Sequence, residues 1–280
     1  MTISRKEATE LLERHGLRPS RALGQNFVVD ANTVRRIARL AEVGPGDRVV
    51  EIGAGLGSLT LALLETGASV TAVEIDRYVL PVLREAVEAK GAIVVQADAM
   101  ALDWAALLGP VGAPERWVMV ANLPYNIATP LVCDLLDGVP QISRMLVMVQ
   151  KEVGERLAAP VRSEAYGAVS VKVAYWAKAK VVGTVPPTVF LPQPKVDSAL
   201  VRIDRRDVPA VDPALVESAA LFALVRTAFG HRRKMLRRSL AGIVSDAQFT
   251  AAAVRPEARP EELAVDDWGR LAVATRSMPA

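Results

Sequence analysis

The chain is poor in the residues that most often bind metals or form cross-links. Its 280 residues include a single cysteine, Cys133, and only two histidines, His15 and His231. One cysteine cannot form a disulfide within the chain, and so few cysteines and histidines cannot build a zinc cluster. We therefore expect no metal site. Cys133 lies in an apolar helical stretch, which favours a buried structural thiol.

Long hydrophobic runs are also missing. Although 51% of the residues are hydrophobic, apolar runs stop short of the ~18 residues that a membrane span requires. The N-terminal segment, with Arg5, Lys6 and Glu7, is too charged for a signal peptide. We expect a soluble, cytoplasmic, monomeric protein without a membrane partner, large enough for one full core and a smaller second domain.

Basic residues are most concentrated in one segment of the chain. The chain has 34 Lys and Arg against 31 Asp and Glu, so its net charge is only +3. From Arg226 to Leu240 there is no acidic residue, and the basic residues there are Arg226, Arg232, Arg233, Lys234, Arg237 and Arg238. A solvated helix face would explain an isolated run of this kind. In a chain so nearly balanced, contact with nucleic-acid phosphates is the favoured interpretation.

Short apolar segments alternate with amphipathic ones along the first part of the chain. One helix, capped by Asp30, is expected before the first strand. Others are expected between the strands, including one with Thr129 as its N-cap and Pro130 in its first turn. Such alternation predicts an α/β fold with a parallel sheet covered on both faces, followed by an antiparallel pair. The expected strands cover residues 48–52, 69–74, 92–96, 117–121, 144–150, 178–185 and 198–204.

Beyond residue 207 the pattern becomes entirely helical. Residues 205–213 have the polar, proline-containing composition of a linker. One helix is expected from Asp212-Pro213 to Gly230, another over the basic segment, and a third at residues 266–275. We predict one domain over residues 1–207 and a small helical RNA-binding domain over residues 208–280.

Three glycines at alternate positions follow the first strand, in Glu51-Ile-Gly-Ala-Gly-Leu-Gly57. They allow main-chain amides to approach a ligand closely. A dinucleotide-binding turn reads G-x-G-x-x-G instead, so the spacing here favours S-adenosylmethionine. Glu74 ends the next strand, where a carboxylate can accept both ribose hydroxyls. Asp98 follows the third strand, where it can accept from the adenine amine.

The segment Asn122-Leu-Pro-Tyr125 follows the fourth strand, at the same edge of the expected sheet. An adenine N6 lone pair is delocalised into the ring, so the nitrogen becomes nucleophilic only when acceptors engage its N–H groups. The side-chain oxygen of Asn122 and the carbonyl of Leu123 can accept, and Tyr125 offers a ring on which an extruded base can stack. A strand-ending turn would explain this segment alone. Its place beside the glycine loop favours methyl transfer to a nucleobase amine.

Five motifs follow one another along the chain. They are Leu23-Gly-Gln-Asn-Phe27, Glu51-Ile-Gly-Ala-Gly-Leu-Gly57, Asn122-Leu-Pro-Tyr125, Phe190-Leu-Pro-Gln-Pro-Lys-Val-Asp-Ser198 and Phe229-Gly-His-Arg-Arg-Lys-Met-Leu236. As a set they resemble the ribosomal RNA adenine N6-dimethyltransferase family of the KsgA/RsmA type. The resemblance implies a Rossmann-like, seven-stranded class I S-adenosylmethionine-dependent methyltransferase domain and a helical C-terminal domain. It also implies a role in ribosome biogenesis, with dimethylation of two adjacent adenosines in the 3′-terminal hairpin loop of 16S rRNA in the pre-30S subunit.

The resemblance also assigns individual residues. It places Asn26, Val28, Gly53, Glu74, Asp98 and Asn122 at S-adenosylmethionine. It places Asn122, Leu123 and Tyr125 at the target base, with Phe190 against the other face of that base. Relatives often have leucine in place of Val28, which matters little for a main-chain contact. Without the resemblance, core packing would be the preferred interpretation of Phe190.

Two other functions remain open. The macrolide-resistance (Erm-type) enzymes methylate a 23S rRNA adenosine and share the Gln-Asn-Phe and glycine motifs, but they resemble this chain less at Leu123 and over residues 190–198. Alternatively, the protein could act mainly as an assembly factor that checks the small subunit by binding it. The intact Asn122-Leu-Pro-Tyr125 argues against an idle active site, although the two roles can coexist.

Overall fold

The chain forms two compact units in the computed structural model, which describes residues 2–20, 22–112 and 115–277. The first, here called the sheet unit, comprises Met1–Gly154 and Lys180–Asp204. The second, the helical unit, comprises Glu155–Ala179 and Arg205–Ala280. Residues 155–179 thus group with the C-terminal helices, whereas the sequence pattern favours a single boundary at residue 207.

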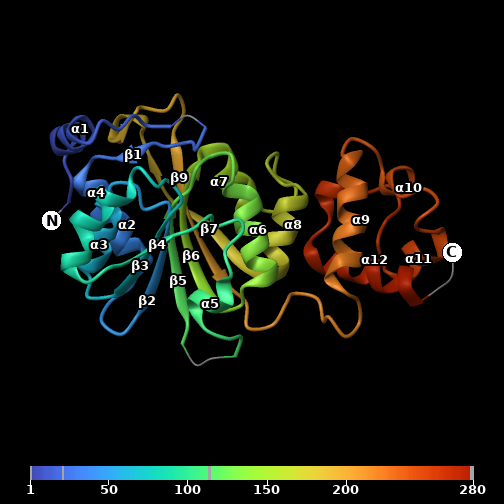
Figure 1. Ribbon diagram of the computed structural model, residues 1–280. Coiled ribbons are helices and arrows are strands. Elements are labelled where there is room, and N and C mark those ends of the chain that lie inside the picture. The colour runs from blue at the N-terminus through green and yellow to red at the C-terminus, as the bar shows by residue number, and fades with distance from the viewer. Residues whose placement is uncertain (1, 21, 113–114, 278–280) are drawn as a thin grey trace. The chain divides into compact units, whose positions relative to one another are not determined.

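The sheet unit contains a seven-stranded sheet of order β4-β3-β2-β5-β6-β9-β7 (Figure 1). Strands β4, β3, β2, β5 and β6 are parallel, and β9 is antiparallel to β6. This confirms the predicted α/β fold class. The strands are β2 (Arg48–Ile52), β3 (Ser69–Glu74), β4 (Ile93–Gln96), β5 (Trp117–Asn122), β6 (Ile142–Gln150), β7 (Ala177–Val185) and β9 (Ser198–Arg205).

Helices cover both faces of this sheet. In Figure 1, α2, α3 and α4 lie on one face, and α5 and α6 lie on the other. The face beneath α2 and α3 is closed by a buried apolar cluster that includes Ile37, Val49 and Leu63. The helices are α2 (Ala31–Ala41), α3 (Ser58–Leu64), α4 (Leu80–Val87), α5 (Trp104–Leu108) and α6 (Ala128–Gly138), and α7 (Lys151–Leu157) follows β6.

Two helix starts illustrate how local sequence sets these elements. Asp30 caps α2 as predicted, because its side chain accepts a hydrogen bond from a first-turn N–H group. Helix α6 begins earlier than predicted: its N-cap is Ile127, and Thr129 and Pro130 lie within the helix. The N–H group of Ile127 bonds to the carbonyl of Pro124, so the turn at Pro124 leads directly into the helix.

A second sheet of two strands, which the sequence pattern does not predict, joins distant segments. β1 (Phe27–Val28) pairs in antiparallel orientation with β8 (Phe190–Leu191). Helix α1 (Arg5–Arg14) is fastened to the same region, because Nη2 of Arg5 donates to the carbonyl of Phe190 at 3.0 Å. Two of the five motifs are therefore held together through their main chains.

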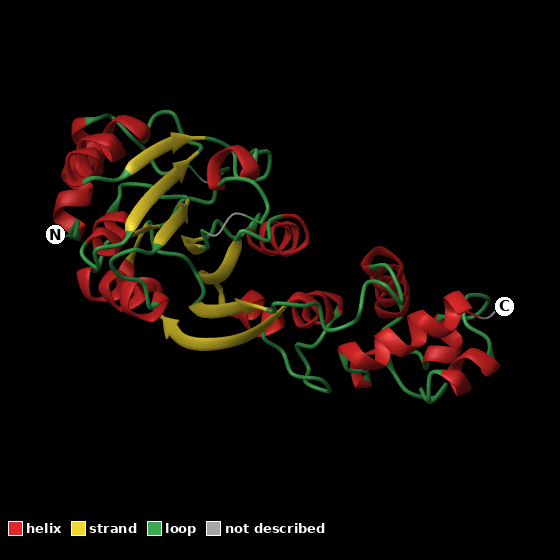
Figure 2. Ribbon diagram, turned by 90° about the horizontal axis from the view of Figure 1, so that it is seen from below, coloured by secondary structure: helices red, strands yellow, loops and turns green. Residues whose placement is uncertain are grey.

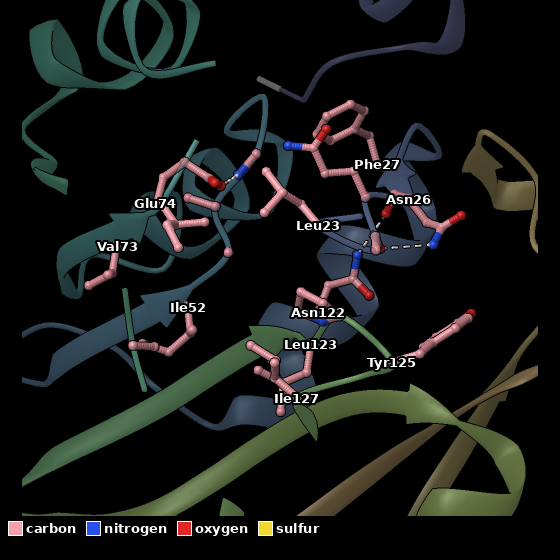
Figure 3. A pocket seen from close by; sticks show the side chains of 18 of the residues that line it. Leu23, Asn26, Phe27, Ile52, Val73, Glu74, Asn122, Leu123, Tyr125 and Ile127 are labelled. Atoms are coloured by element: carbon pink, nitrogen blue, oxygen red, sulfur yellow. Dashed lines mark hydrogen bonds between the residues drawn. The ribbon is translucent and has the colours of Figure 1, made fainter. Parts of the chain in front are cut away.

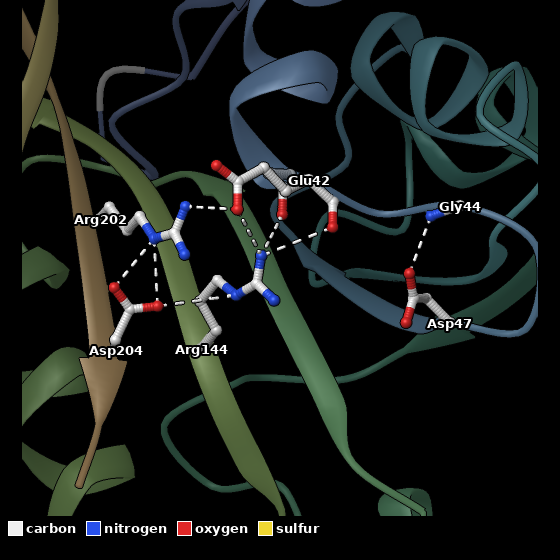
Figure 4. Close-up of polar contacts among 7 residues, drawn as sticks. Glu42, Gly44, Asp47, Arg144, Arg202 and Asp204 are labelled. Atoms are coloured by element: carbon white, nitrogen blue, oxygen red, sulfur yellow. Dashed lines mark hydrogen bonds and ion pairs between the residues drawn. The ribbon is translucent and has the colours of Figure 1, made fainter.

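A cluster of ion pairs fastens the end of α2 to the antiparallel part of the sheet (Figure 4). Arg202 on β9 pairs with Glu42 at 2.7 Å and with Asp204 at 2.9 Å. Arg144 on β6 pairs with the same two carboxylates and donates to the carbonyl of Ala41 at 2.9 Å. The Arg202 guanidinium lowers the pKa of Glu42. Because Glu42 has a left-handed φ of 51°, the cluster holds the residue at which the chain turns away from α2.

The helical unit is organised around one apolar core, in which Trp268 is fully buried. Helix α8 belongs to this core because Tyr175 packs edge-on against Phe222 of α9, and nearby Tyr166 donates to the carbonyl of Leu263 at 2.9 Å. These contacts explain why residues 155–179 group with the C-terminal helices. The helices, which Figure 1 labels, are α8 (Ala168–Trp176), α9 (Ser218–Gly230), α10 (Leu236–Ser239), α11 (Asp246–Ala251) and α12 (Val265–Ser277). Figure 2 draws the helices of the chain in red and its strands in yellow.

The helix expected from Asp212-Pro213 starts later than predicted. α9 begins at Ser218, although it ends at Gly230 as expected. Asp212 closes an isolated turn instead, because its carboxylate accepts from the N–H group of Ala214 at 2.9 Å.

The basic segment is not one continuous helix, so that prediction is wrong. Residues 231–235 are not helical, and α10 covers only Leu236–Ser239. The side chains of Leu236 and Leu240 are fully buried, so they anchor this segment in the core while most of its cations remain exposed. Across the described part of the chain, no helix combines the length and the apolar composition needed to cross a membrane.

Candidate active site

A cavity of about 280 Å³ lies where the parallel strands β2, β3, β4 and β5 end. Residues from the four following loops line it, together with residues 22–28. In Figure 3, Glu74 lies to the left of Asn122 and Tyr125 to its right. The lining includes every residue that the sequence assigns to the cofactor, namely Asn26, Val28, Gly53, Glu74, Asp98 and Asn122.

The glycine loop after β2 can pass close to its neighbours because it has no side chains at two positions. Gly55 has φ +56°, and a Cβ there would lie 2.8 Å from the ring of Phe27. Gly57 has φ +87°, and a Cβ there would lie 2.7 Å from Val87. Both conformations and both distances require glycine. The loop therefore presents main-chain atoms to the cavity, as its alternate glycines predict.

The carboxylate of Glu74, at the end of β3, is held by main-chain groups. Glu74 is only 5% exposed. Its Oε2 accepts from the N–H group of Gly55 at 2.8 Å, and its Oε1 accepts from that of Asp76 at 2.9 Å. Burial raises the pKa of Glu74, and these two hydrogen bonds oppose the rise. Since each carboxylate oxygen has a further lone pair, Glu74 can still accept from two neighbouring hydroxyl groups.

A second carboxyl group, that of Glu51 on β2, lies behind the glycine loop. Glu51 is 1% exposed, and its Oε2 accepts from the Thr60 hydroxyl at 2.6 Å. Burial raises the pKa of Glu51 to about 8, and repulsion from Glu74 adds to the rise. Glu51 therefore carries a proton at neutral pH, which avoids two adjacent negative charges in the interior.

Two hydrogen-bond acceptors stand at the end of β5. The Nδ2 of Asn122 donates to the carbonyl of Asn26 at 2.9 Å (Figure 3). Because a carbonyl can only accept, this bond fixes the amide orientation and leaves the Oδ1 of Asn122 to accept from a ligand. The N–H group of Leu123 donates to the carbonyl of Met148 at 3.0 Å, while no described residue donates to the carbonyl of Leu123. Neither oxygen thus accepts a hydrogen bond from a described residue, and both residues line the cavity.

The two aromatic residues assigned to the base occupy different surroundings. Tyr125 lines the cavity, and its hydroxyl lies 3.3 Å from that of Ser198. Phe190 is 1% exposed and packs in the core with Val28 and Ile37, outside the cavity lining. A stacking role for Phe190 would require its side chain to leave the core, so this role stays a prediction.

Asp98 lies on the exposed side of the cavity. Its Oδ1 accepts from the N–H group of Met100 at 2.9 Å. Ile75 and Met100 also line the cavity, although they are 45% and 40% exposed, respectively. An exposed apolar pair beside a carboxylate suits a planar ring with an amino group. The sequence pattern predicts a role for neither residue, although each one closely follows an acid assigned to the cofactor.

The cations of the basic run fall into two groups. Arg232 donates to the carbonyl of Glu164 at 2.7 Å and lies 3.8 Å from the Glu261 carboxylate, so its side chain joins segments of the helical unit. Arg237 pairs with Glu257 at 3.5 Å. The remaining side chains are exposed and form no ion pair within the described residues: Arg226, Arg233, Lys234 and Arg238. These four stay candidates for contact with phosphates.

Two further expectations concern metal binding and the single cysteine. Within residues 2–20, 22–112 and 115–277, no group of three or more His, Cys, Asp or Glu side chains is arranged to hold a metal ion. Cys133 is buried in α6, as predicted.

Comparison with known proteins identifies the family. A family model described as "Ribosomal RNA adenine dimethylase" matches residues 17–275. The chain belongs to the ribosomal RNA adenine dimethylase family. It is 46% identical over 275 residues to "Ribosomal RNA small subunit methyltransferase A" of Kineococcus radiotolerans, covering 96% of this chain and 90% of that protein. A protein of the same name from Streptomyces coelicolor is also 46% identical, with 95% and 94% covered.

Solved structures support the same fold. The crystal structure of the 23S rRNA methyltransferase ErmE has a TM-score of 0.67 and 28% identity, covering 90% of this chain and 100% of that chain. A dimethyladenosine transferase from Plasmodium falciparum has a TM-score of 0.69 and 24% identity, covering 86% and 94%. The chain is thus an S-adenosylmethionine-dependent methyltransferase that dimethylates adenine in ribosomal RNA, which confirms the predicted enzyme class and cofactor.

We expect Glu51→Gln to change how stability depends on pH. Because burial raises the pKa of Glu51 to about 8, folding retains a proton that the unfolded chain releases above its ordinary pKa of 4.5. Stability should therefore fall as pH rises between these values, by as much as ~1.4 kcal/mol per pH unit. Glutamine has no such titration and can still accept from Thr60. In thermal unfolding, the unfolding temperature of the variant should rise relative to that of the wild type as pH increases from about 5.5 to about 8.5.

The matched control is Glu88→Gln, since Glu88 is exposed and pairs with Arg84 at 3.5 Å on the surface of the sheet unit. Its unfolding temperature should follow that of the wild type at every pH. If the curve for Glu51→Gln also runs parallel to the wild type, the raised pKa is wrong.

Proposed function

We propose that this enzyme dimethylates two adjacent adenosines in the 3′-terminal hairpin loop of 16S rRNA, acting as a cytoplasmic monomer on a pre-30S small subunit. The observation that carries an adenine amine as the target is the pair of acceptors on Asn122 and Leu123 beside the glycine loop. The relatives named for the small subunit, at 46% identity, favour this substrate over 23S rRNA, because ErmE is only 28% identical.

The cavity residues suit each part of S-adenosylmethionine, whose sulfonium centre supplies an activated methyl group. The carboxylate of Glu74 would accept from the ribose hydroxyls, and Asp98 would accept from the adenine amine. Ile75 and Met100 would flank the adenine ring. The main chain at Gly53 leaves room for the ligand, since a Cβ there would meet nothing closer than 3.7 Å.

The residues after β5 would make the target amine nucleophilic. When the Oδ1 of Asn122 and the carbonyl of Leu123 accept from the two N–H bonds of N6, the lone pair leaves conjugation with the ring and points toward the methyl group. Tyr125, held by Ser198, would stack on the base. After each transfer one amine proton passes to solvent. One N–H bond remains after the first transfer, so an acceptor can hold the amine for the second.

RNA binding would involve the exposed cations of the helical unit. Arg226, Arg233, Lys234 and Arg238 have no carboxylate partner among the described residues, so phosphates could bind them without first breaking an ion pair. Their position in a unit with its own core separates RNA binding from cofactor binding.

Replacing Glu74 with Ala tests the cofactor site. The variant should bind S-adenosylmethionine more weakly by about 1.5–3 kcal/mol, because hydrogen bonds to a charged acceptor are lost. Isothermal calorimetry measures this directly, and circular dichroism checks that the protein stays folded. Glu88→Ala, at an exposed position, should bind like the wild type. Unchanged affinity in folded Glu74→Ala would remove Glu74 from the site.

Replacing Asn122 with Ala tests the catalytic assignment. Losing one acceptor for the amine should lower the single-turnover methylation rate of small-subunit particles about 10- to 100-fold, more than it weakens RNA binding. Tyr125→Ala should raise the free-energy barrier of the reaction by roughly 1–3 kcal/mol, because stacking on the base is lost. The control is Asn32→Ala, on the exposed side of α2. Wild-type rates in both variants would rule out the assignment.

The double variant Arg233→Ala/Lys234→Ala tests the RNA surface. Each lost phosphate contact should flatten the dependence of log affinity on log salt by about 0.7–0.9. Filter binding across a salt series gives this slope, and calorimetry should show unchanged cofactor affinity. Arg255→Ala is the matched control, because Arg255 lies in the same unit but already pairs with Glu262 at 3.0 Å. An unaltered slope would mean that the run is only a solvated surface.

A further inference from the structure

Residues 22–26, here called the crossing segment, contact both walls of the cavity that they line. On the wall of Glu74, the Nε2 of Gln25 donates to the Oδ2 of Asp76 at 2.8 Å. On the opposite wall, the carbonyl of Asn26 accepts from Asn122 at 2.9 Å. Gly24, with φ +63°, runs so close to this wall that a Cβ would lie 3.1 Å from Pro124. The segment therefore spans the cavity from the cofactor side to the target-base side.

The amide of Gln25 makes hydrogen bonds at both of its polar atoms. Its Oε1 accepts from the N–H group of Ser20 at 2.7 Å, while its Nε2 donates to Asp76. A carboxylate only accepts and an N–H group only donates, so the amide orientation is determined. The N–H group of Asp76 in turn donates to Glu74 at 2.9 Å. A chain of hydrogen bonds thus leads from the crossing segment to the carboxylate at the proposed ribose position.

We propose that Gln25 is a positioning residue for cofactor binding, which acts through Asp76 to hold the crossing segment in place between Glu74 and Asn122. This inference rests on the proposed placement of S-adenosylmethionine beside Glu74. Gln25 needs no contact with the reacting atoms. Because Gln25 directly precedes Asn26, which is assigned to the cofactor, the anchor at Asp76 also holds that residue in the cavity wall.

The variant Gln25→Ala of the full chain separates this role from catalysis. Loss of a hydrogen bond to a carboxylate should raise the dissociation constant of S-adenosylmethionine about ten-fold in calorimetry. The KM for the cofactor should rise in parallel. The single-turnover rate at saturating cofactor should change less than about two-fold, because bound cofactor restores the ordered segment. A fall in that rate with unchanged KM would overturn the proposal.

A double-mutant cycle with Asp76→Ala tests whether Gln25 acts through Asp76. If it does, the double variant should bind the cofactor no more weakly than Asp76→Ala alone, because the contact is already absent. Fully additive losses would overturn the proposed route.

Two further variants control the experiment. Gln141→Ala removes a glutamine whose Nε2 donates to the carbonyl of Gly109 at 2.9 Å, at the opposite end of β5 from the cavity. It should retain wild-type cofactor affinity; a loss equal to that of Gln25→Ala would overturn the specific role. If Glu74→Ala weakens cofactor binding and Gln25→Ala does not, the inference fails and the proposed site stands. If neither does, the proposed site itself is wrong.

Discussion

The parallel pairing of β3, β2 and β5 is the constraint on which the site depends. Ile52 lies opposite Val73 on one side and Ala121 on the other, so three loops leave the sheet at the same level. Glu74 then bonds to the main chain of Gly55 across the gap between two of these loops. The pairing that buries the apolar core therefore also assembles the cofactor wall, and a change in strand register would disrupt both.

Electrostatics within this wall follow from burial. Two carboxyl groups behind one loop would repel each other if both were ionised. Burial raises the pKa of Glu51 to about 8, whereas Glu74, although its pKa is also raised, has two main-chain N–H donors that favour its ionised form. The main-chain donors therefore favour negative charge on the carboxylate that lines the cavity, where a cationic sulfonium ligand would benefit from it.

The sequence predicted those features that depend on residues close together along the chain. The expected ranges of β2 and β3 match the structure, and the residues assigned to the cofactor all line one cavity. The pairing of β1 with β8 and the grouping of α8 with the C-terminal helices depend on contacts between distant segments, which periodicity does not encode. Gln25 was missed for the same reason, because its partner Asp76 lies on another loop. The prediction for the basic run failed because residues 231–235 are not helical and the buried Leu236 and Leu240 fix the following short helix in the core.

The two aromatic residues that we propose for the target base are supported by different strands. Tyr125 is held by Ser198 at the start of β9, so its ring position depends on the main sheet. Phe190 lies on β8, which pairs with the strand that directly follows Asn26, and Arg5 binds its carbonyl. The pairing of β1 with β8 therefore links Phe190 to the segment that carries Asn26, whereas the hydroxyl of Tyr125 is linked to β9. The two aromatic side chains that the proposal assigns to the base thus depend on different parts of the fold for their positions.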